Sequence, residues 1–483
     1  MLTLNLRHDG TDPLYRQIYA GLRAQILAGA LPAGTQLPSS RALANHYQIA
    51  RITVVQAYEQ LALEGFIEQR HGSGSYVSEG LQLPADRPVS TRPHWARWGQ
   101  RLETVIAAPE EVEATQRPEF DFGFGRPLRQ SFPYDVWRRL LARYLSTDDA
   151  ILARYGSAAG FLPLREAVAD YLVQWRGVRC VPEQVVIVSG SQQALDILAR
   201  LLLTPGDCVA VEDPGFVDAY ELLRMHGARL CGVPTDAQGL ISSALPEGER
   251  IRLAFVTPSN QFPKGGTLPL KRRLELLNWA ARHNAYLIED DYDGELRYEG
   301  RPVAALQGLD GAGRVIYLGS FSKVLFPALR LGYVVLPEPL LERFVQTKAL
   351  VDRGAPTLTQ AAVTDFISEG HFERHLKRLR RAYGARRAVL LAAVAQAMPA
   401  GSYKVVTEPA GLHVMLYLQP GLNEALLIRA AAQQGLHFYA GSPYHLNPPP
   451  APSILLGFSG LDESQIEVGI GRLAQLIEQV RQL

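Results

Sequence analysis

Six short apolar segments, separated by helical patterns, constrain the fold of this chain more than any other feature. They are residues 185–188, 209–211, 253–256, 286–288, 315–318 and 333–336. Each is predicted to be a strand that is buried on both faces. Strands that alternate with helices form a mostly parallel sheet, so the sequence predicts an α/β domain over residues 119–483. A smaller α+β part is expected from about residue 345, where long basic helices begin.

Composition excludes several classes of protein. Of the 483 residues, 47% are hydrophobic and 20% are charged, and the formal net charge of +1 produces no global attraction to nucleic acid. The three cysteines are widely spaced, which excludes a disulfide scaffold and a cysteine-based metal site. No apolar stretch reaches the roughly 20 residues that span a bilayer, and no signal-peptide pattern is present. We therefore expect a cytoplasmic protein with no membrane partner.

Residues 11–78 are predicted to form a separate small unit. Apolar residues at every fourth position of 14–26 predict a first helix, and Ser39 provides a cap for a second. Residues 51–64 predict a third helix, and two short strands follow it, joined by a glycine-containing turn at 70–74. Two helices, a tight turn and a β-hairpin make a winged helix-turn-helix.

Such a unit would place the N-terminal residues of its third helix in the major groove of DNA. The candidate DNA contacts are Ser40, Arg41, Arg51, Thr53, His71 and Gly72. Arg51 can pair with a guanine edge or a phosphate, and the hydroxyl groups can bind phosphates. Because acidic and basic residues nearly balance here, a module that only packs against the large domain is the alternative. Arg41, Arg51 and Arg70 gather near the turn, however, and this favours DNA binding.

The residues around Lys323 predict a site for pyridoxal 5'-phosphate (PLP). Lys323 follows Ser320 and Ser322, Arg330 comes seven residues later, and an acidic segment with a tyrosine lies upstream at 289–292. A lysine ε-amine forms a Schiff base with the cofactor's aldehyde, and an aspartate keeps the pyridine nitrogen protonated. The serine hydroxyls and Arg330 would take the phosphate.

Ser191 and Gln192 provide a second candidate phosphate contact. They follow the apolar segment 185–188 and begin a helical pattern. Backbone N–H groups at a helix N-terminus bind phosphate readily, so we expect these residues to help hold the cofactor. A plain strand-to-helix turn is the alternative interpretation.

Both ends of the chain resemble parts of one family. Three segments resemble the GntR-superfamily winged helix, namely Leu37-Pro38-Ser39-Ser40-Arg41, Arg51-x-Thr53-Val54 and Gly72-Ser73-Gly74-Ser75. In that superfamily the positions of Arg41, Arg51, Thr53, His71 and Gly72 touch DNA. The whole chain resembles a MocR-type transcriptional regulator, which joins a GntR reader to a fold type I, aspartate aminotransferase-like domain that binds PLP. Ala50 departs from the pattern, because many relatives carry serine or threonine there.

The resemblance implies further cofactor contacts. Asp290 would face the pyridine nitrogen, and Tyr292 would face the ring oxygen O3'. Phe216, in Glu212-Asp213-Pro214-Gly215-Phe216, would lie against the ring unless it is a core residue. Either Asn260 or Gln261 would also reach O3', unless both only satisfy the turn in which they lie.

The resemblance also implies a homodimer. Tyr155-x-x-x-x-Gly160-x-x-x-Leu164-Arg165 resembles the family segment that reaches across a dimer interface to the partner's phosphate, although it could simply start a surface helix. Paired DNA-binding units recognise paired half-sites. Residues 79–118 contain several prolines and are predicted to be a linker, with a short helix at 95–106. Its length permits the head-to-tail, domain-swapped arrangement of this family.

One position departs from an aminotransferase. Leu455, in Ile454-Leu455-Leu456-Gly457-Phe458, stands where the family carries the arginine that binds the substrate carboxylate. Leucine cannot form that charge-assisted pair, so carboxylate binding should weaken by about 2–5 kcal/mol. Arg126, Arg353 and His445 are candidate substitutes. The sequence therefore predicts an inefficient transaminase and leaves a residual half-reaction open.

These observations favour a transcriptional regulator that binds an operator and senses PLP, an amine or an amino acid through an internal aldimine at Lys323. An active PLP-dependent aminotransferase with an accessory winged helix is the alternative, and a pseudoenzyme that needs no PLP is a weaker one. The basic residues of 371–387 could steer DNA or form the solvated face of a helix. The target genes, the operator, the effector and the direction of regulation stay open.

Overall fold

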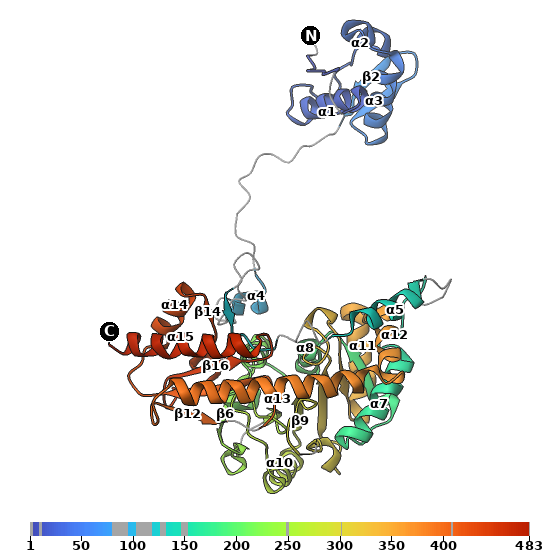
Figure 1. The fold of residues 1–483 in the computed structure, drawn as a ribbon. Helices are drawn as coiled ribbons and strands as arrows, with labels where there is room; N and C mark the ends of the chain where they lie inside the picture. The colour runs from blue at the N-terminus through green and yellow to red at the C-terminus, as the bar shows by residue number, and fades with distance from the viewer. Residues whose placement is uncertain are drawn as a thin grey trace. The chain divides into compact units, whose positions relative to one another are not determined.

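The computed structural model describes residues 3–8, 12–79, 95–102, 118–125, 132–145, 153–247, 251–300, 302–406 and 409–482. The chain forms two compact units, Met1–His94 and Trp95–Leu483 (Figure 1). Each unit is built around its own cluster of buried apolar side chains. In the part of the chain that the structure describes, no helix has the length and apolar character needed to cross a membrane.

The first unit is a winged helix-turn-helix, which confirms the prediction. Its elements are α1 (Leu14–Leu27), α2 (Ser40–Tyr47), α3 (Arg51–Leu63), β1 (Ile67–Arg70) and β2 (Gly74–Val77). Ser39 caps α2, because its hydroxyl accepts a hydrogen bond from the Ala42 N–H at 3.2 Å. The two strands pair antiparallel, with Ile67 opposite Val77. They form the wing.

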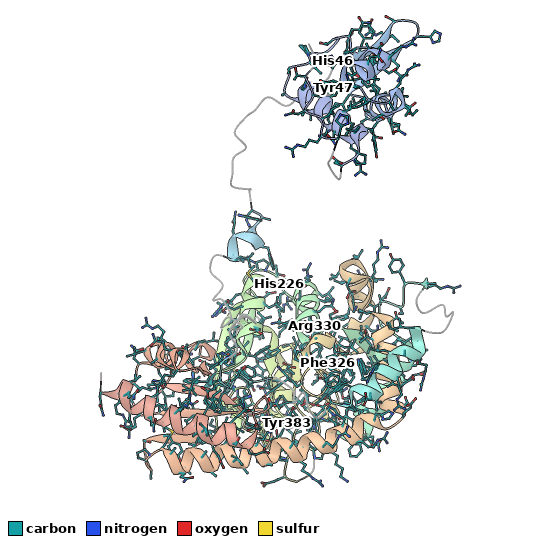
Figure 2. All side chains as sticks on the ribbon, turned by 45° about the horizontal axis from the view of Figure 1, so that its top comes forward. His46, Tyr47, His226, Phe326, Arg330 and Tyr383 are labelled. Carbon is teal, nitrogen blue, oxygen red and sulfur yellow. A yellow bond between two sulfur atoms is a disulfide. The ribbon has the colours of Figure 1, made fainter. Side chains whose placement is uncertain are left out.

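Side chains at helical spacing build the core of this unit. The buried residues are Ile18, Leu22 and Ile26 of α1 and Val54, Ala57, Tyr58 and Leu61 of α3. Leu14, which the periodicity places on the same face, is only half-buried. The end of α2 is also fixed, because the Tyr47 hydroxyl accepts a hydrogen bond from the Leu4 N–H at 2.6 Å. Tyr47 also contacts His46 edge to face, with 4.7 Å between ring centroids (Figure 2).

An eight-stranded sheet forms the centre of the second unit. The order is β4 (Val185–Val188), β11 (Gly332–Val335), β10 (Val315–Ser320), β9 (Tyr286–Asp291), β8 (Ile251–Val256), β5 (Cys208–Asp213), β6 (Arg229–Asp236) and β7 (Gly239–Leu240). Neighbouring strands from β10 to β6 are parallel. β11 is antiparallel to both β4 and β10, and β7 is antiparallel to β6. The sheet is therefore mostly parallel, and it contains all six predicted strands.

Helices cover the sheet, which explains why its strands are apolar on both faces. They are α5 (Tyr134–Leu145), α7 (Leu162–Arg176), α8 (Ser191–Leu202), α9 (Val217–Met225), α10 (Leu270–His283), α11 (Glu338–Asp352) and α12 (Thr357–Ser368). Val185 and Ile187 of β4 belong to one buried cluster, whereas Val186 and Val188 belong to another. Alternate residues of one strand thus fill two apolar layers.

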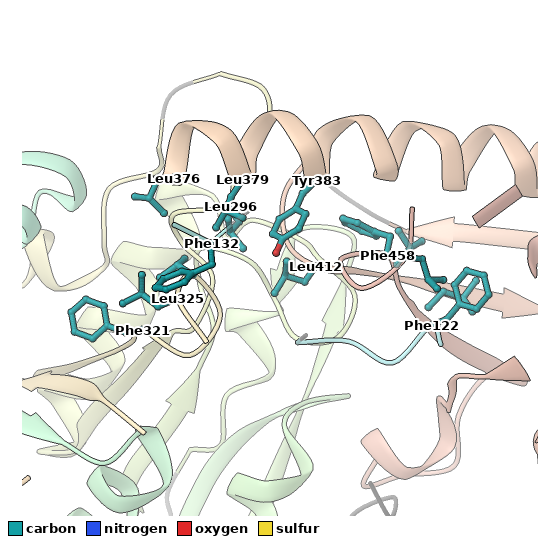
Figure 3. Close-up of a cluster of buried hydrophobic side chains, with 14 of the residues drawn as sticks. Phe122, Phe132, Leu296, Phe321, Leu325, Leu376, Leu379, Tyr383, Leu412 and Phe458 are labelled. Carbon is teal, nitrogen blue, oxygen red and sulfur yellow. The ribbon is translucent and has the colours of Figure 1, made fainter. Parts of the chain in front are cut away.

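A smaller α+β part completes the unit. A four-stranded sheet has the order β12 (Tyr403–Val406), β13 (His413–Leu418), β16 (Ser453–Gly457) and β15 (Tyr439–Ala440). The short strands β3 (Phe120–Asp121) and β14 (Leu436–His437) pair in parallel beside it, and its helices are α13 (His371–Ala397), α14 (Glu424–Gln433) and α15 (Glu463–Arg481). Leu376, Leu379 and Tyr383 of α13 pack into one apolar cluster with residues of both parts (Figure 3). The long α13 thereby joins the two parts.

The predicted linker lies mostly outside the described residues. Its described portion contains α4 (Arg97–Arg101), which lies within the helix expected at 95–106; residues 103–106 of that prediction lie outside the described residues. The Arg101 guanidinium donates a hydrogen bond to the Met225 carbonyl at the end of α9, at 2.8 Å. Trp95 and Trp98 are exposed. The arginine, rather than the tryptophans, therefore provides the clearest docking contact of this segment.

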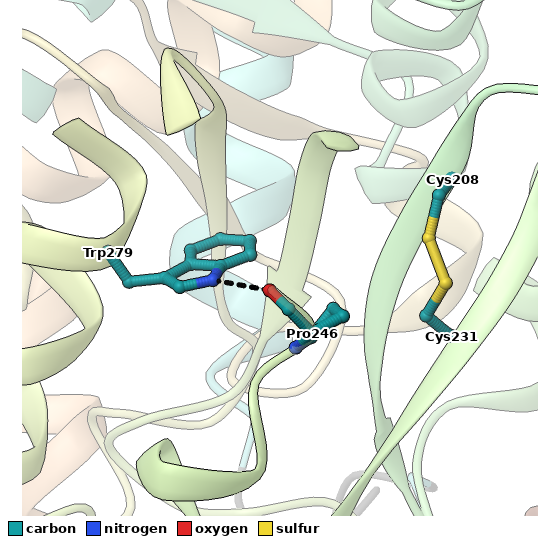
Figure 4. Close-up of a disulfide and its surroundings, with 4 residues drawn as sticks. All are labelled: Cys208, Cys231, Pro246 and Trp279. Atoms are coloured by element: carbon teal, nitrogen blue, oxygen red, sulfur yellow. Dashed lines mark hydrogen bonds between the residues drawn. A yellow bond between two sulfur atoms is a disulfide. The ribbon is translucent and has the colours of Figure 1, made fainter. Parts of the chain in front are cut away.

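A disulfide joins Cys208 of β5 to Cys231 of β6 (Figure 4). The two cysteines are 23 residues apart, and the parallel pairing of their strands brings the Cα atoms to 6.4 Å. Cys180 is free. A single cross-strand bond is not a disulfide scaffold, and the spacing alone could not predict it, because the bond depends on which strands are neighbours.

Candidate cofactor site and nucleic-acid interface

The strands of the large sheet bring the predicted cofactor residues to one edge. β4, β5, β8, β9 and β10 run in the same direction, and their C-terminal ends lead into the segments singled out in the sequence. Ligands of such sheets bind in the crevice outside these strand ends. A cavity of about 340 Å³ lies there, lined by Phe124, Gly125, Gly190, Ser191, Gln192, Phe216, Asp218, Thr257, Phe262, Asp290, Tyr292, Ser320, Ser322, Lys323, Pro327, Arg330 and Tyr439.

Most of the predicted cofactor residues line this cavity. They are Ser191, Gln192, Phe216, Asp290, Tyr292, Ser320, Ser322, Lys323 and Arg330. Asn260 and Tyr155 do not line it. The other lining residues were not predicted from the sequence; they are Phe124, Gly125, Gly190, Asp218, Thr257, Phe262, Pro327 and Tyr439.

Lys323 reaches into the cavity from the loop after β10. Its Nζ atom lies 5.7 Å from the centroid of the Phe124 ring. A Cβ atom on Gly125 would lie only 2.5 Å from the same Nζ, and Gly125 has a φ of +79°. The backbone conformation therefore favours glycine at position 125, and a larger residue there would displace the end of the Lys323 side chain.

Arg330 and the start of α8 meet on one side of the cavity. Arg330 has a φ of +48°, and its Nη2 atom would lie 3.5 Å from a Cβ atom on Gly190. Gly190 immediately precedes Ser191 and Gln192, the first residues of α8. Free N–H groups at a helix N-terminus and a guanidinium both attract anions, so this side of the cavity suits a phosphate.

Asp290 is a buried carboxylate near the end of β9. Burial and the charge of Asp291 raise its pKa to about 7, while the charge of Lys323 acts in the opposite direction. Its Oδ1 atom has no hydrogen-bond partner among the described residues. Burying a hydrogen-bond acceptor without a donor destabilises the protein. A protonated ring nitrogen would donate to this oxygen and favour the ionised form of the Asp290 carboxyl group.

Asp291 is held by a buried ion pair, which favours a structural role for it. The Arg176 Nη2 atom lies 2.7 Å from Asp291 Oδ2, and both side chains are about 2% exposed. The Tyr317 hydroxyl donates to the same oxygen at 2.5 Å. Arg176 also donates to the Ser259 hydroxyl at 3.0 Å, which ties the end of β9 to the loop after β8.

Asn260 and Gln261 have different surroundings. The Asn260 amide donates to the Tyr292 hydroxyl at 3.1 Å and to the Asp293 carboxylate at 2.7 Å. Gln261 is fully buried and donates to the Pro214 carbonyl at 2.8 Å, so it holds its own loop in place. Of the two, Asn260 is the residue that contacts the predicted cofactor site, and it does so through Tyr292.

Tyr155 lies away from the cavity of its own chain. Its side chain is 83% exposed, and the Arg353 guanidinium lies 5.6 Å from its ring centroid. Its predicted contact with the phosphate of a partner subunit stays a prediction.

Leu455 lies in a buried cluster of apolar and aromatic side chains. It is fully buried in β16, opposite Met415 and Tyr439 in the sheet, and it packs with Val217 and Phe262. Three possible replacements for the missing arginine were predicted from the sequence. Arg353 and His445 do not line the cavity, and Arg126 lies outside the described residues.

The predicted DNA contacts lie on α2, α3 and the wing. Arg41, Arg51, His71 and Gly72 are exposed, and Ser40 and Thr53 are half-buried. Arg51 donates a hydrogen bond to the Ser40 hydroxyl at 3.2 Å, so the starts of α2 and α3 meet. Arg70 forms an ion pair with Glu79 at 2.9 Å and stacks on Tyr76, so its charge is compensated within the wing.

The basic helix α13 is less available to DNA than its composition suggests. Arg380 donates to the Glu295 carbonyl at 2.7 Å, and the buried Arg386 donates to the Ser459 carbonyl at 2.8 Å. These contacts favour a structural role for part of its positive charge.

Comparisons with known proteins agree with this architecture. Residues 14–77 match the family model of bacterial regulatory proteins, gntR family, and residues 119–473 match that of aminotransferase class I and II. The probable rhizopine catabolism regulatory protein MocR of Rhizobium meliloti is 39% identical, over 97% of this chain and 95% of its own. The pyridoxine biosynthesis transcriptional regulator PdxR of Corynebacterium glutamicum is 30% identical, over 97% of each chain.

Several solved structures that resemble this chain are aminotransferases. LysN, the α-aminoadipate aminotransferase of Thermus thermophilus, was solved in complex with N-(5'-phosphopyridoxyl)-L-leucine and is 32% identical. The similarity covers 80% of this chain and 97% of LysN, with a TM-score of 0.73. This chain therefore belongs to the MocR-type regulators, in which a GntR-family winged helix is joined to a domain of aminotransferase class I and II.

Proposed function

We propose that this protein is a PLP-binding transcriptional regulator, which binds an operator through its winged helix and responds to PLP, an amine or an amino acid. The family supports a DNA-binding regulator with an aminotransferase-like domain. One observation supports the proposal that the protein binds PLP: Lys323, Arg330 and Asp290 line the same cavity.

The residues of the cavity fit the chemical groups of PLP. Lys323 would hold the aldehyde as a Schiff base, and Arg330 would hold the phosphate together with Ser320, Ser322 and the start of α8. Asp290 would face the ring nitrogen, and its unpaired Oδ1 atom supports this assignment within the described part of the chain. When bound, PLP supplies an electron sink for chemistry at an amine-bearing carbon.

The protein's own side chains would orient the ligand and exclude water. Asp290 would hold a proton on the ring nitrogen through a buried charge pair. The hydroxyl of Tyr292, fixed by Asn260, would face O3'. The rings of Phe124, Phe216 and Phe262 shield the cavity and strengthen electrostatic interactions inside it.

Regulation requires that the ligand bind two arrangements of the protein with different affinity. We propose a homodimer, which can be head-to-tail and domain-swapped, in which the exposed Tyr155 reaches the phosphate site of the partner. Two DNA-binding units in one dimer would read two half-sites, and a ligand that changes their spacing would change operator affinity.

The alternative is an active aminotransferase with an accessory DNA-binding unit. Leu455 argues against it, because this buried side chain cannot form the charge-assisted pair that an arginine forms with a substrate carboxylate. An assay with an amino donor and 2-oxoglutarate should therefore show no sustained product formation. Turnover in the ordinary range of about 1–1000 per second would favour the alternative.

Arg51→Ala should weaken operator binding by about 1–3 kcal/mol if Arg51 reads a base pair. The PLP absorbance should not change, because Arg51 lies in the first unit. Affinity is measured at fixed salt, since phosphate contacts make it salt-dependent. Arg16→Ala removes an equal charge from the exposed face of α1 and provides the control. Equal affinities of wild type and Arg51→Ala would remove Arg51 from the recognition surface.

A further inference from the structure

The charged residues of the cavity can be compared with the groups that PLP would bring. Four charged side chains line it, namely Lys323, Arg330, Asp290 and Asp218. Under the proposed function, the first three serve the aldehyde, the phosphate and the ring nitrogen. Asp218 is left without a role toward the cofactor.

Asp218 lies in the first turn of α9, two residues after Phe216. Burial raises the pKa of its carboxyl group, while the charge of Lys323 and a hydrogen bond with Gln192 act in the opposite direction. No ion pair with Asp218 is found within the described ranges of the chain. A carboxylate in a partly enclosed site gains most from a cationic partner.

Aromatic rings surround the same space. Phe262 lies 5.5 Å from Phe124 and 5.6 Å from Phe216, measured between ring centroids, and Phe124 lies 5.3 Å from Tyr439. All four rings line the cavity. Ring faces attract alkylammonium groups and also bind the methylene chain that carries them.

The cavity offers little to a ligand carboxylate. Under the proposed function its two basic side chains serve the cofactor, and the buried Leu455, which packs with Phe262, supplies no positive charge. An acidic ligand end would lie near Asp218 and be repelled by it. The charges that line the cavity therefore favour a ligand whose second end is cationic over one whose second end is anionic.

We propose that the effector is an aliphatic diamine, with one amino group at Lys323 and the cofactor and the second paired with Asp218. This inference rests on the proposed function and narrows the effector to one chemical class. It assigns Asp218 as a specificity-determining residue.

Three ligands that share a five-carbon chain test it on the PLP-loaded, full-length protein. They are 1,5-diaminopentane, pentylamine and 5-aminopentanoate, whose second ends are cationic, apolar and anionic. Calorimetry should show the diamine binding about 10- to 100-fold more tightly than 5-aminopentanoate. Asp218→Asn should remove this preference, and Asp218→Glu should retain part of it. Glu467→Gln, on the exposed side of α15, makes the same change in charge and should leave the preference intact.

The outcomes separate this inference from the proposed function. If all three ligands bind equally, or if none binds while PLP and operator binding are normal, the diamine assignment is wrong and the regulator proposal stands. If Asp218→Asn keeps the PLP absorbance and the preference, Asp218 is not the selecting residue. If the wild-type protein takes up no PLP, the proposed function fails and this inference fails with it.

Discussion

Lys323→Ala is expected to abolish the absorbance of the Schiff base between this protein and PLP. Lys323 is the lysine that lines the cavity with Arg330 and Asp290, and no other amine is placed there among the described residues. Alanine has no amine to condense with the aldehyde, so the loss should be complete rather than partial. The ultraviolet-visible spectrum of the protein mixed with PLP measures it directly.

Lys264→Ala provides a matched control. Lys264 is also partly buried in the second unit, but its Nζ atom donates to the Thr235 carbonyl at 2.8 Å and does not line the cavity. Its removal should leave the spectrum unchanged. If the Lys323→Ala protein kept the wild-type spectrum, another lysine would carry the cofactor and the assigned site would be wrong.

Arg176→Met should lower the free energy of unfolding of the second unit by about 3–5 kcal/mol, because it leaves the buried Asp291 carboxylate without its cationic partner. Arg176 and Asp291 are both nearly inaccessible to water, and each is tied to further polar groups. Methionine fills a similar volume, so the change in the free energy of unfolding comes mainly from the lost charge and only slightly from lost packing.

Tryptophan fluorescence during urea unfolding measures this effect in the second unit alone. All five tryptophans of the chain lie between residues 95 and 279, within Trp95–Leu483. Arg272→Met is the control, since its ion pair with Asp236 is partly exposed and should contribute no more than about 1 kcal/mol. Similar losses in the two variants would contradict a special role for the buried pair.

The fold could be predicted where burial leaves a continuous apolar segment. The six predicted strands satisfy this condition because helices cover both faces of the sheet. β6 was missed, because its buried residues, such as Val233 and Thr235, alternate with exposed ones, including a proline. Its place beside β5 depends on tertiary pairing, and so does the Cys208–Cys231 bond.

The cofactor site could be predicted to the extent that it is built from strand ends. Asp290, Lys323 and Ser191 each follow or end an apolar segment, and a parallel sheet brings such positions together. Phe124, Gly125 and Tyr439 come from segments beside β3 and β14, which pair with each other across more than 300 residues of sequence. No local sequence pattern predicts the pairing of β3 with β14, so these residues could not be assigned to the site.

Operator affinity as a function of the ligand state of Lys323 decides whether this protein is a ligand-responsive regulator. Affinity for DNA upstream of the protein's own gene is measured at one salt concentration, without PLP, with PLP, and with PLP plus 1,5-diaminopentane. We expect the operator affinity or the footprint of the wild-type protein to change between these states. The Lys323→Ala protein should respond to neither ligand. Equal binding by both proteins in all three states would contradict the proposed regulation.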